Sequence, residues 1–346
     1  MRAPAFWWRS TPSLAANLLR PTSLIYGAVA AWRMRKTGER AALPIICIGN
    51  FTAGGAGKTP TALAVARMLE GAGESPAFLS RGYGGKLAGP VQVGLHHNAA
   101  DVGDEPLLLS GVAPAIISRD RPAGARLAYE IGATVLVMDD GLQNPSLVKD
   151  CSVAVVDGAT GIGNGLPLPS GPVRAPMASQ WPAIDAVLVI GAGEGGDGVA
   201  HEAERRGKRV FRARLTPDPA QAAALRERPV LAFAGIGRPD KFFETLRACG
   251  AKIEVAQAFP DHHPYSAEDI ARLRQQAESA GLQAVTTEKD LVRIAGASGE
   301  GSWADLMALP VKLQLEDEAA FRNFVLRRVN ERRLRSGFSV WTPTVR

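Results

Sequence analysis

Cysteine is scarce in this sequence of 346 residues. The three cysteines, Cys47, Cys151 and Cys249, lie far apart and include no CxxC pair. Cysteines that are few and odd in number imply no disulfide framework, and they are typical of a protein in a reducing compartment. Cys47 and Cys151 lie in or beside apolar runs, so we interpret them as small buried hydrophobic residues.

The sequence also lacks basic residues spread along its whole length. The formal net charge is +6, yet residues 1–40 alone hold seven basic residues against the single acid Glu39. A protein that binds nucleic acid is expected to carry a basic face on its folded body, so we expect no nucleic-acid partner. With 46% hydrophobic and 21% charged residues, the composition is that of a globular enzyme. The length is enough for two domains.

A long apolar run is missing near the N-terminus as well. The uncharged stretch between Arg20 and Arg33 is too short to cross a bilayer, which takes about 20 apolar residues. Aromatic and aliphatic side chains flanked by arginines predict instead that residues 1–38 form a helix in a membrane interface. Two alternatives stay open. The helix could pack on the protein's own core, or Ala28-Val29-Ala30 could be the cleavage site of a secretory signal.

From residue 44 onward, short β-rich runs alternate with helical stretches. Continuous apolar strands separated by helices indicate a parallel sheet with helices on both faces. A Gly/Pro-rich stretch over 161–176 is predicted to be a long, functional loop. The composition changes at 216–229, after which a second alternation begins and ends in a helix over 317–334. The predicted organisation is a membrane-associating helix (1–38), a first α/β domain (39–215), a linker (216–229) and a second, smaller α/β domain (230–346).

The strongest signal follows the first predicted strand, where residues 53–59 have the sequence AGGAGKT. The strict Walker A pattern requires glycine at position 52, where this chain has threonine, so the strict match fails. The segment instead resembles the GGxGKT variant of P-loop NTPases. Its glycines let backbone N–H groups surround phosphate oxygens, and the next helix directs its N-terminus at the anion. Lys58 is expected to neutralise the β- and γ-phosphates, and Thr59 to bind Mg²⁺. The alternative is a Gly-rich turn that only starts a helix. The predicted nucleotide-binding residues are Thr52, Ala53, Gly54, Gly55, Ala56, Gly57, Lys58 and Thr59.

Two acids end a later apolar strand, at Asp139 and Asp140. Carboxylates at the carboxyl end of a parallel strand lie on the ligand-binding edge of the sheet. Beside a P-loop, this pair is predicted to be the Walker B acids that bring Mg²⁺ to the site. Taken alone, Asp-Asp-Gly also fits a simple turn.

Further polar groups are candidates for the chemistry of phosphate transfer. Asp104 either caps a helix that begins at Pro106 or accepts the proton of an attacking hydroxyl. His262 and His263 lie in a proline-bracketed turn, where histidines are most often solvated, and no third ligand cluster supports a metal site there. Arg81 and Arg174 either neutralise phosphate charge or lie on the surface.

Taken together, these segments resemble the tetraacyldisaccharide 4'-kinase family, the lipid A 4'-kinases. The shared segments are GNFTAGGAGKTP, SRGYGG, VGDEP, DDGLQNP, GNGLPLPSGPVR, FAGIGRPDKFFETL, FPDHHPYS and TTEKDLV, in that order. The similarity extends from the N-terminal helix to about residue 315. It implies an α/β fold with a P-loop NTPase-type parallel sheet, helices on both of its faces, and a second, smaller Rossmann-like domain.

The resemblance also implies an activity and a location. The family uses ATP and Mg²⁺ to phosphorylate the 4'-hydroxyl of a tetraacylated glucosamine disaccharide 1-phosphate, which gives lipid IVA. Its members work at the cytoplasmic face of the Gram-negative inner membrane, so we expect a peripheral or monotopic monomer whose N-terminal basic helix meets that face.

Carried over residue by residue, the resemblance assigns roles within the site. Lys58 and Thr59 become the P-loop pair, Asp139 and Asp140 the metal-binding acids, and Asp104 the base. His262 becomes the partner of Asp104 in a dyad, and Arg174 a cation beside the phosphates. Lys289, in TTEKD, matches as well and is expected to have a structural role.

One position departs from the family pattern, which often has Arg-Glu where this chain has Arg174-Ala175. The role of that glutamate is therefore unfilled here or supplied from elsewhere. Two other classes of function fit part of the sequence. A membrane-associated regulatory P-loop ATPase of the partitioning or positioning type does not predict a second domain carrying Asp-His-His, and a non-catalytic peripheral adaptor does not predict Lys58 together with the paired acids.

Overall fold

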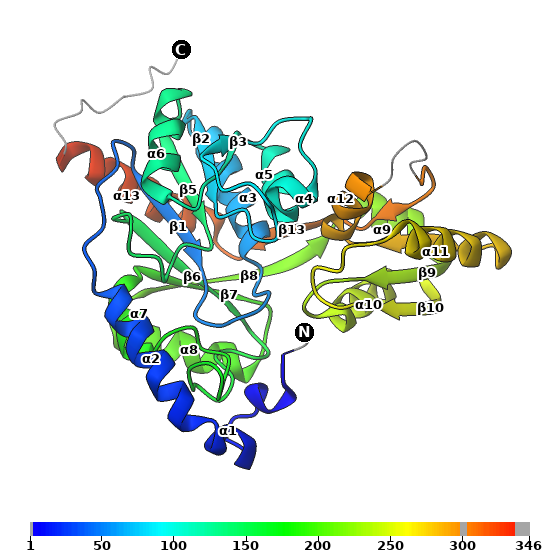
Figure 1. Ribbon diagram of the computed structural model, residues 1–346, viewed down its shortest axis with the longest axis horizontal. Helices are drawn as coiled ribbons and strands as arrows, with labels where there is room; N and C mark the ends of the chain where they lie inside the picture. Colours follow the sequence, from blue (N-terminus) through cyan, green and yellow to red (C-terminus); the bar gives the residue numbers. More distant parts are fainter. Residues whose placement is uncertain (1–2, 298–302, 336–346) are drawn as a thin grey trace.

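The computed structural model describes residues 3–297 and 303–335, and these form two α/β units joined side by side (Figure 1). The larger unit is built on one sheet, whose strands are β1 (Ile45–Gly49), β2 (Pro76–Ser80), β3 (Val91–Gln92), β4 (Ala115–Ile117), β5 (Val135–Asp139), β6 (Cys151–Asp157), β7 (Ala186–Ile190), β8 (Arg209–Pro217) and β13 (Val311–Leu315). The smaller unit has a sheet of β9 (Pro229–Ala234), β10 (Lys252–Ala258), β11 (Gln283–Thr286) and β12 (Met307–Ala308).

The order of strands in the large sheet is β13-β8-β7-β6-β1-β5-β2-β4-β3. All neighbours run parallel except at the two edges, where β13 pairs with β8 and β3 pairs with β4 in antiparallel fashion. The small sheet has the order β10-β9-β11-β12 and is parallel throughout. In an open parallel sheet the ligand lies beyond the carboxyl ends of the strands, so this topology places β1, β5 and β6 around the expected site.

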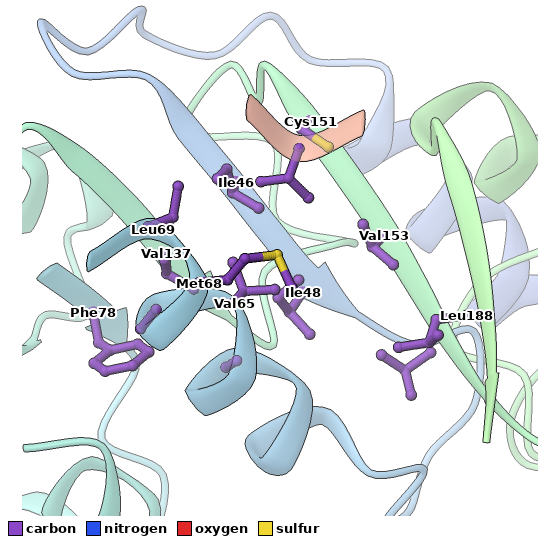
Figure 2. Packing of buried hydrophobic residues seen from close by; sticks show 14 of the residues in the cluster. Ile46, Ile48, Val65, Met68, Leu69, Phe78, Val137, Cys151, Val153 and Leu188 are labelled. Carbon is purple, nitrogen blue, oxygen red and sulfur yellow. The ribbon is translucent and has the colours of Figure 1, made fainter. Parts of the chain in front are cut away.

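Helices cover both faces of the large sheet, as the continuous apolar strands predict. Figure 2 shows Val65, Met68 and Leu69 of one helix pointing toward Ile46 and Ile48 of β1. The helices on this face are α3 (Lys58–Glu70), α5 (Asp104–Ser110) and α13 (Glu318–Arg335), and those on the opposite face are α6 (Arg121–Glu130), α7 (Met177–Gln180), the 3-10 turn η2 (Trp181–Ala183) and α8 (Glu194–Arg205). The short helix α4 (Ala99–Val102) precedes α5.

The small unit repeats this arrangement on a smaller scale. Its two clusters of buried side chains lie on opposite faces of its sheet, one around Phe242 and Leu246 and the other around Phe233 and Tyr265. Ser266 and Asp269 form the predicted capping box at the start of the third helix of this unit. Its helices are α9 (Pro219–Leu225), α10 (Pro239–Ala248), α11 (Ala267–Ser279) and α12 (Glu288–Ala297).

The C-terminal segment differs from the predicted division, which placed all of 230–346 in the second domain. β13 pairs with β8 at the edge of the large sheet, and Phe321 and Val325 of α13 are completely buried in the large core. The ring of Phe321 lies 4.9 Å from that of Phe211 in β8. The predicted linker also differs, because its residues form the end of β8 and helix α9, whose Leu225 is buried in the small core. The segment over 310–316 was predicted to be a strand of the second domain, but β13 joins the large sheet instead.

The N-terminal segment forms η1 (Ala5–Trp8), α1 (Leu14–Leu18) and α2 (Arg20–Met34). α2 lies beside the start of α7 (Figure 1). One side of α2 rests on the Gly/Pro-rich loop: Ser23 Oγ donates to Pro167 O at 2.7 Å, and a Cβ on Gly27 would lie 3.3 Å from Pro176. Trp7 Nε1 donates to Pro169 O of the same loop at 2.9 Å. Along residues 3–297 and 303–335, no helix has both the length and the apolar character needed to cross a membrane.

Candidate active site

The P-loop lies between β1 and α3, as predicted. Gly54 and Gly57 have φ angles of 114° and 91°, in the left-handed region that glycine tolerates best. A Cβ on Gly54 or Gly55 would meet nothing within 4 Å, so the loop faces open space where phosphates can approach its backbone. Asn50 Nδ2 donates to Gly54 O at 3.1 Å and holds the loop in shape.

The remaining P-loop residues anchor the loop to the protein. Ala53 N donates to Pro172 O at 2.7 Å, and Thr52 forms an antiparallel bridge with Val173. Ala56 is buried in the core. The Gly/Pro-rich loop predicted to be functional therefore supports one side of the phosphate loop.

Lys58, Asp140 and Arg174 form one cluster. Lys58 Nζ lies 3.8 Å from Asp140 Oδ2 and 3.5 Å from Gly54 O, and Arg174 Nη1 lies 2.7 Å from Asp140 Oδ1. Burial opposes the charge of Asp140, but Lys58 and Arg174 more than offset this effect and lower its pKa. Arg174 Nε also donates to Thr52 O at 2.9 Å. Arg174 is thus bound both to the P-loop and to Asp140, one of the two predicted metal-binding acids.

Asp139 is completely enclosed, and neither of its carboxylate oxygens has a hydrogen-bond partner in the described part of the chain. Burial and the negative charge of Glu105 raise its pKa, against the opposing effect of Lys58. A buried carboxylate without partners is costly unless a cation or water satisfies it. Thr59, the third predicted metal ligand beside Asp139 and Asp140, is buried at the start of α3.

These residues fit a magnesium ion. No group of three or more His, Cys, Asp or Glu side chains suited to a metal occurs within residues 3–297 and 303–335. Mg²⁺ does not need one, because it is usually held by one or two carboxylates together with substrate phosphates and water. The unpartnered oxygens of Asp139 are the structural feature that fits such an ion.

Asp104 and His262 lie in contact although they are far apart in the sequence. Asp104 is the first residue of α5 and is buried, and its Oδ1 lies 3.4 Å from His262 Nδ1, in the turn after β10. The Asp104 side chain does not cap its helix, so the simple structural alternative is wrong. Asp104 raises the pKa of His262, although burial of the imidazole opposes this effect.

A third residue, Arg293 of α12, completes this group and was missed by the sequence analysis. Its Nε lies 2.9 Å from Asp104 Oδ2, and its Nη2 contacts the same oxygen. Burial would raise the pKa of Asp104, but its hydrogen bond to His262 and the positive charges of Arg293 and Lys289 hold it well below its ordinary value. Arg293 follows Asp290 by three residues on one helix, a spacing that predicts an intrahelical pair but gives no sign of the contact with Asp104.

The remaining residues singled out in the sequence make contacts outside the P-loop and the pair of Asp104 and His262. His263 Nε2 lies 2.9 Å from Asp269 Oδ2, and its ring stacks on Phe259 at 4.7 Å. Arg81 is exposed. Lys289 Nζ lies 2.7 Å from Glu105 Oε1 and joins the two units. Ala175 is completely buried, and its carbonyl accepts a hydrogen bond from Gln180 Nε2 at 2.7 Å.

A loop of the small unit approaches the P-loop directly. A Cβ on Gly237 would lie 3.9 Å from Gly55 N. Next to it, Arg238 Nη1 and Lys241 Nζ lie 2.9 and 2.8 Å from the same oxygen of Asp157, at the carboxyl end of β6. Groups from both units therefore lie beside the P-loop.

Known proteins resemble this chain over most of its length. The chain is 59% identical to the tetraacyldisaccharide 4'-kinase of Methylobacterium nodulans over 321 residues, which cover 92% of this chain and 94% of the relative. It is 50% identical to the enzyme of the same name from a Bradyrhizobium strain (BTAi1) over 345 residues, 99% of this chain and 100% of the relative. The solved structure of LpxK from Aquifex aeolicus in complex with ATP superposes with a TM-score of 0.72 at 25% identity and covers 91% of this chain and 100% of that one.

The family model described as tetraacyldisaccharide-1-P 4'-kinase, or LpxK, matches residues 15–330. This range includes the P-loop, the paired acids, and both partners of the contact between Asp104 and His262. The chain belongs to the tetraacyldisaccharide 4'-kinase (LpxK) family.

Proposed function

We propose that this protein transfers the γ-phosphate of ATP to the 4'-hydroxyl of a tetraacylated disaccharide 1-phosphate and so produces lipid IVA. The observation that carries the proposal is the convergence of two sets of groups. Lys58 and the P-loop come from the large unit, and His262 is brought from the small unit against Asp104. A regulatory P-loop ATPase has no need of a base for a sugar hydroxyl.

Phosphoryl transfer depends mainly on positioning and on charge stabilisation. The P-loop backbone and Lys58 are placed to bind the phosphates, and Arg174 adds a second positive charge on the same side. Thr59, Asp139 and Asp140 would hold Mg²⁺, which neutralises phosphate charge when it is bound. Asp104 and His262 take the proton of the hydroxyl as its oxygen bonds to phosphorus.

The activity can be tested by incubating the purified protein with [γ-³²P]ATP and an acylated disaccharide 1-phosphate. We expect a labelled lipid that carries one more phosphate than the acceptor, and no labelled lipid when EDTA removes Mg²⁺. Release of labelled inorganic phosphate at the same rate with and without the acceptor would support an ATPase instead.

The N-terminal segment is proposed to hold the protein at the cytoplasmic face of the inner membrane. The side of α1 and α2 turned away from the Gly/Pro-rich loop exposes large apolar side chains: Leu14 (77%), Leu18 (73%), Leu24 (73%), Ile25 (69%), Val29 (52%) and Trp32 (60%). Exposed apolar side chains flanked by arginines are typical of a helix that lies in the interface of an anionic membrane.

Replacing Leu24, Ile25 and Trp32 together by serine should release the protein from anionic vesicles. The contacts of Ser23 and Gly27 with the loop stay in place, so the fold is preserved. Co-sedimentation with vesicles measures the effect, and high salt should weaken binding of the intact protein only in part. The matched control replaces Tyr129, Ile131 and Leu334, which are exposed elsewhere, and should still sediment. Equal sedimentation of both variants would rule out this surface as the membrane anchor.

A further inference from the structure

Arg293 makes a two-point contact with the carboxylate assigned as the base. Both its Nε, at 2.9 Å, and its Nη2 contact Asp104 Oδ2. The other carboxylate oxygen, Oδ1, faces His262 Nδ1 at 3.4 Å. The side chains of Arg293 and Asp104 are 6% and 4% exposed, so water competes little for either partner.

The guanidinium is held in place by its own unit. Arg293 Nη1 donates to Gly235 O at 2.8 Å and to Asp290 Oδ1 at 2.7 Å. Asp290 is fully buried and in turn accepts hydrogen bonds from Gly235 N at 3.1 Å, Thr287 Oγ1 at 2.6 Å and Tyr265 Oη at 3.1 Å. With Nη1 occupied in this way, Nε and Nη2 have a fixed direction, toward the large unit.

We propose that Arg293 is a positioning residue of the reaction, which fixes the carboxylate of Asp104 so that one oxygen stays available to His262 and to the hydroxyl of the acceptor. The proposal rests on the function assigned above. Because Oδ2 already accepts two hydrogen bonds from Arg293, the proton of the hydroxyl is received on the side of Oδ1 and His262. A carboxylate that could rotate freely would spend much of its time in orientations in which neither oxygen contacts the imidazole of His262.

The groups around Asp104 and His262 also shift the pKa values of these two residues. Asp104 faces the positive groups of Arg293 and Lys289 from α12 and the imidazole of His262, with Glu105 next to it on α5. His262 faces Asp104, Asp261, Arg293 and the ring of Tyr83. Arg293 lowers the pKa of Asp104 and opposes the rise in the pKa of His262. Removal of this cation therefore raises both pKa values.

Two substitutions separate the geometry of Arg293 from its charge. Arg293→Lys keeps a positive charge but cannot make the forked contact, so kcat should fall roughly tenfold to 100-fold while the acidic limb of the kcat–pH profile stays in place. Arg293→Met loses both, so kcat should fall further and the acidic limb should move to higher pH. The limb reports the pKa values of the base in the enzyme–substrate complex. KM for ATP should change little in either variant.

The controls distinguish this role from simple support of the fold. Arg333→Met removes another two-bond arginine–carboxylate pair, with Glu74, and should move neither kcat nor the limb by a comparable amount. If Arg293→Met does not fold, Arg293→Lys carries the test alone. Full kcat in Arg293→Lys, or a fall in kcat of Arg293→Met without movement of the limb, would overturn the proposal. Full turnover in Asp104→Asn would instead overturn the assignment of the base itself, so the two failures are distinguishable.

Discussion

Replacing Lys58 by methionine is expected to remove phosphate transfer almost completely, by at least about 10³-fold in kcat. Lys58 is nearly buried, and its ammonium lies between Gly54 O and the Asp140 carboxylate. There the ammonium can stabilise the negative charge that develops on the phosphate oxygens as the bond to the leaving group breaks. An interaction that strengthens in the transition state acts on kcat more than on binding.

The measurement is single-turnover transfer from [γ-³²P]ATP to the acylated acceptor, together with thermal unfolding of each variant. Lys208→Met is the matched control, because its ammonium donates to Ile184 O at 2.7 Å, outside the cluster of Lys58, Asp140 and Arg174. The control should keep its turnover, and Lys58→Met should keep its fold. Near-normal transfer by a folded Lys58→Met variant would show that this loop does not bind the reacting phosphates.

Asp104→Asn and His262→Ala should each reduce kcat by about 10²–10⁴-fold, the usual range for a lost general base. An aspartate alone is a weak base at neutral pH, and here Arg293 and His262 hold its pKa lower still despite its burial. The imidazole is the group of the pair that can hold a proton near neutral pH. Removal of either partner should therefore disable the other.

The double variant tests whether the two residues act as one unit. Residues that act together are strongly non-additive, so Asp104→Asn/His262→Ala should be little slower than the slower single variant. His263→Ala is the adjacent control, since His263 pairs with Asp269 and stacks on Phe259 away from Asp104. Effects of the two substitutions that multiply, or full activity in His262→Ala, would mean that no dyad operates.

The local parts of the site could be predicted from the sequence because each depends on neighbours in the chain. Glycines before Lys58 predict a loop that can surround phosphates, and apolar runs ending in Asp139 predict acids at the sheet edge. Contacts between residues far apart in the sequence could not be predicted, because they leave no pattern in the residues around either partner. Arg293 follows Asp104 by 189 positions, and its spacing from Asp290 resembles any surface pair on a helix.

In the large sheet, the strands that are buried on both faces could be predicted from their continuous apolar runs. β13, which is only partly buried, was predicted as well, but β8 was not. β8 was missed because Arg209, Arg212 and Arg214 interrupt its apolar residues, and the strand is only partly buried. The partner of β13 could not be predicted either, because alternation indicates one polar face and not which strand lies alongside. Conversely, the pairing of Asp104 with His262 was expected from family resemblance, and the residues alone left it open.

The pairing of β8 with β13 limits the order in which the two units can complete their folding during synthesis. Pro217 is aligned with Val311, and Asp218 N donates to Pro310 O at 2.9 Å, so the small unit leaves and rejoins the large sheet at the same point. On a ribosome, residues 229–308 emerge before β13 and α13, which supply the edge strand and the buried Phe321 and Val325 of the large core. The large unit, although its first strands are synthesised first, is therefore the last to be completed. The core of a nascent chain's large unit stays incomplete until the small unit has been synthesised.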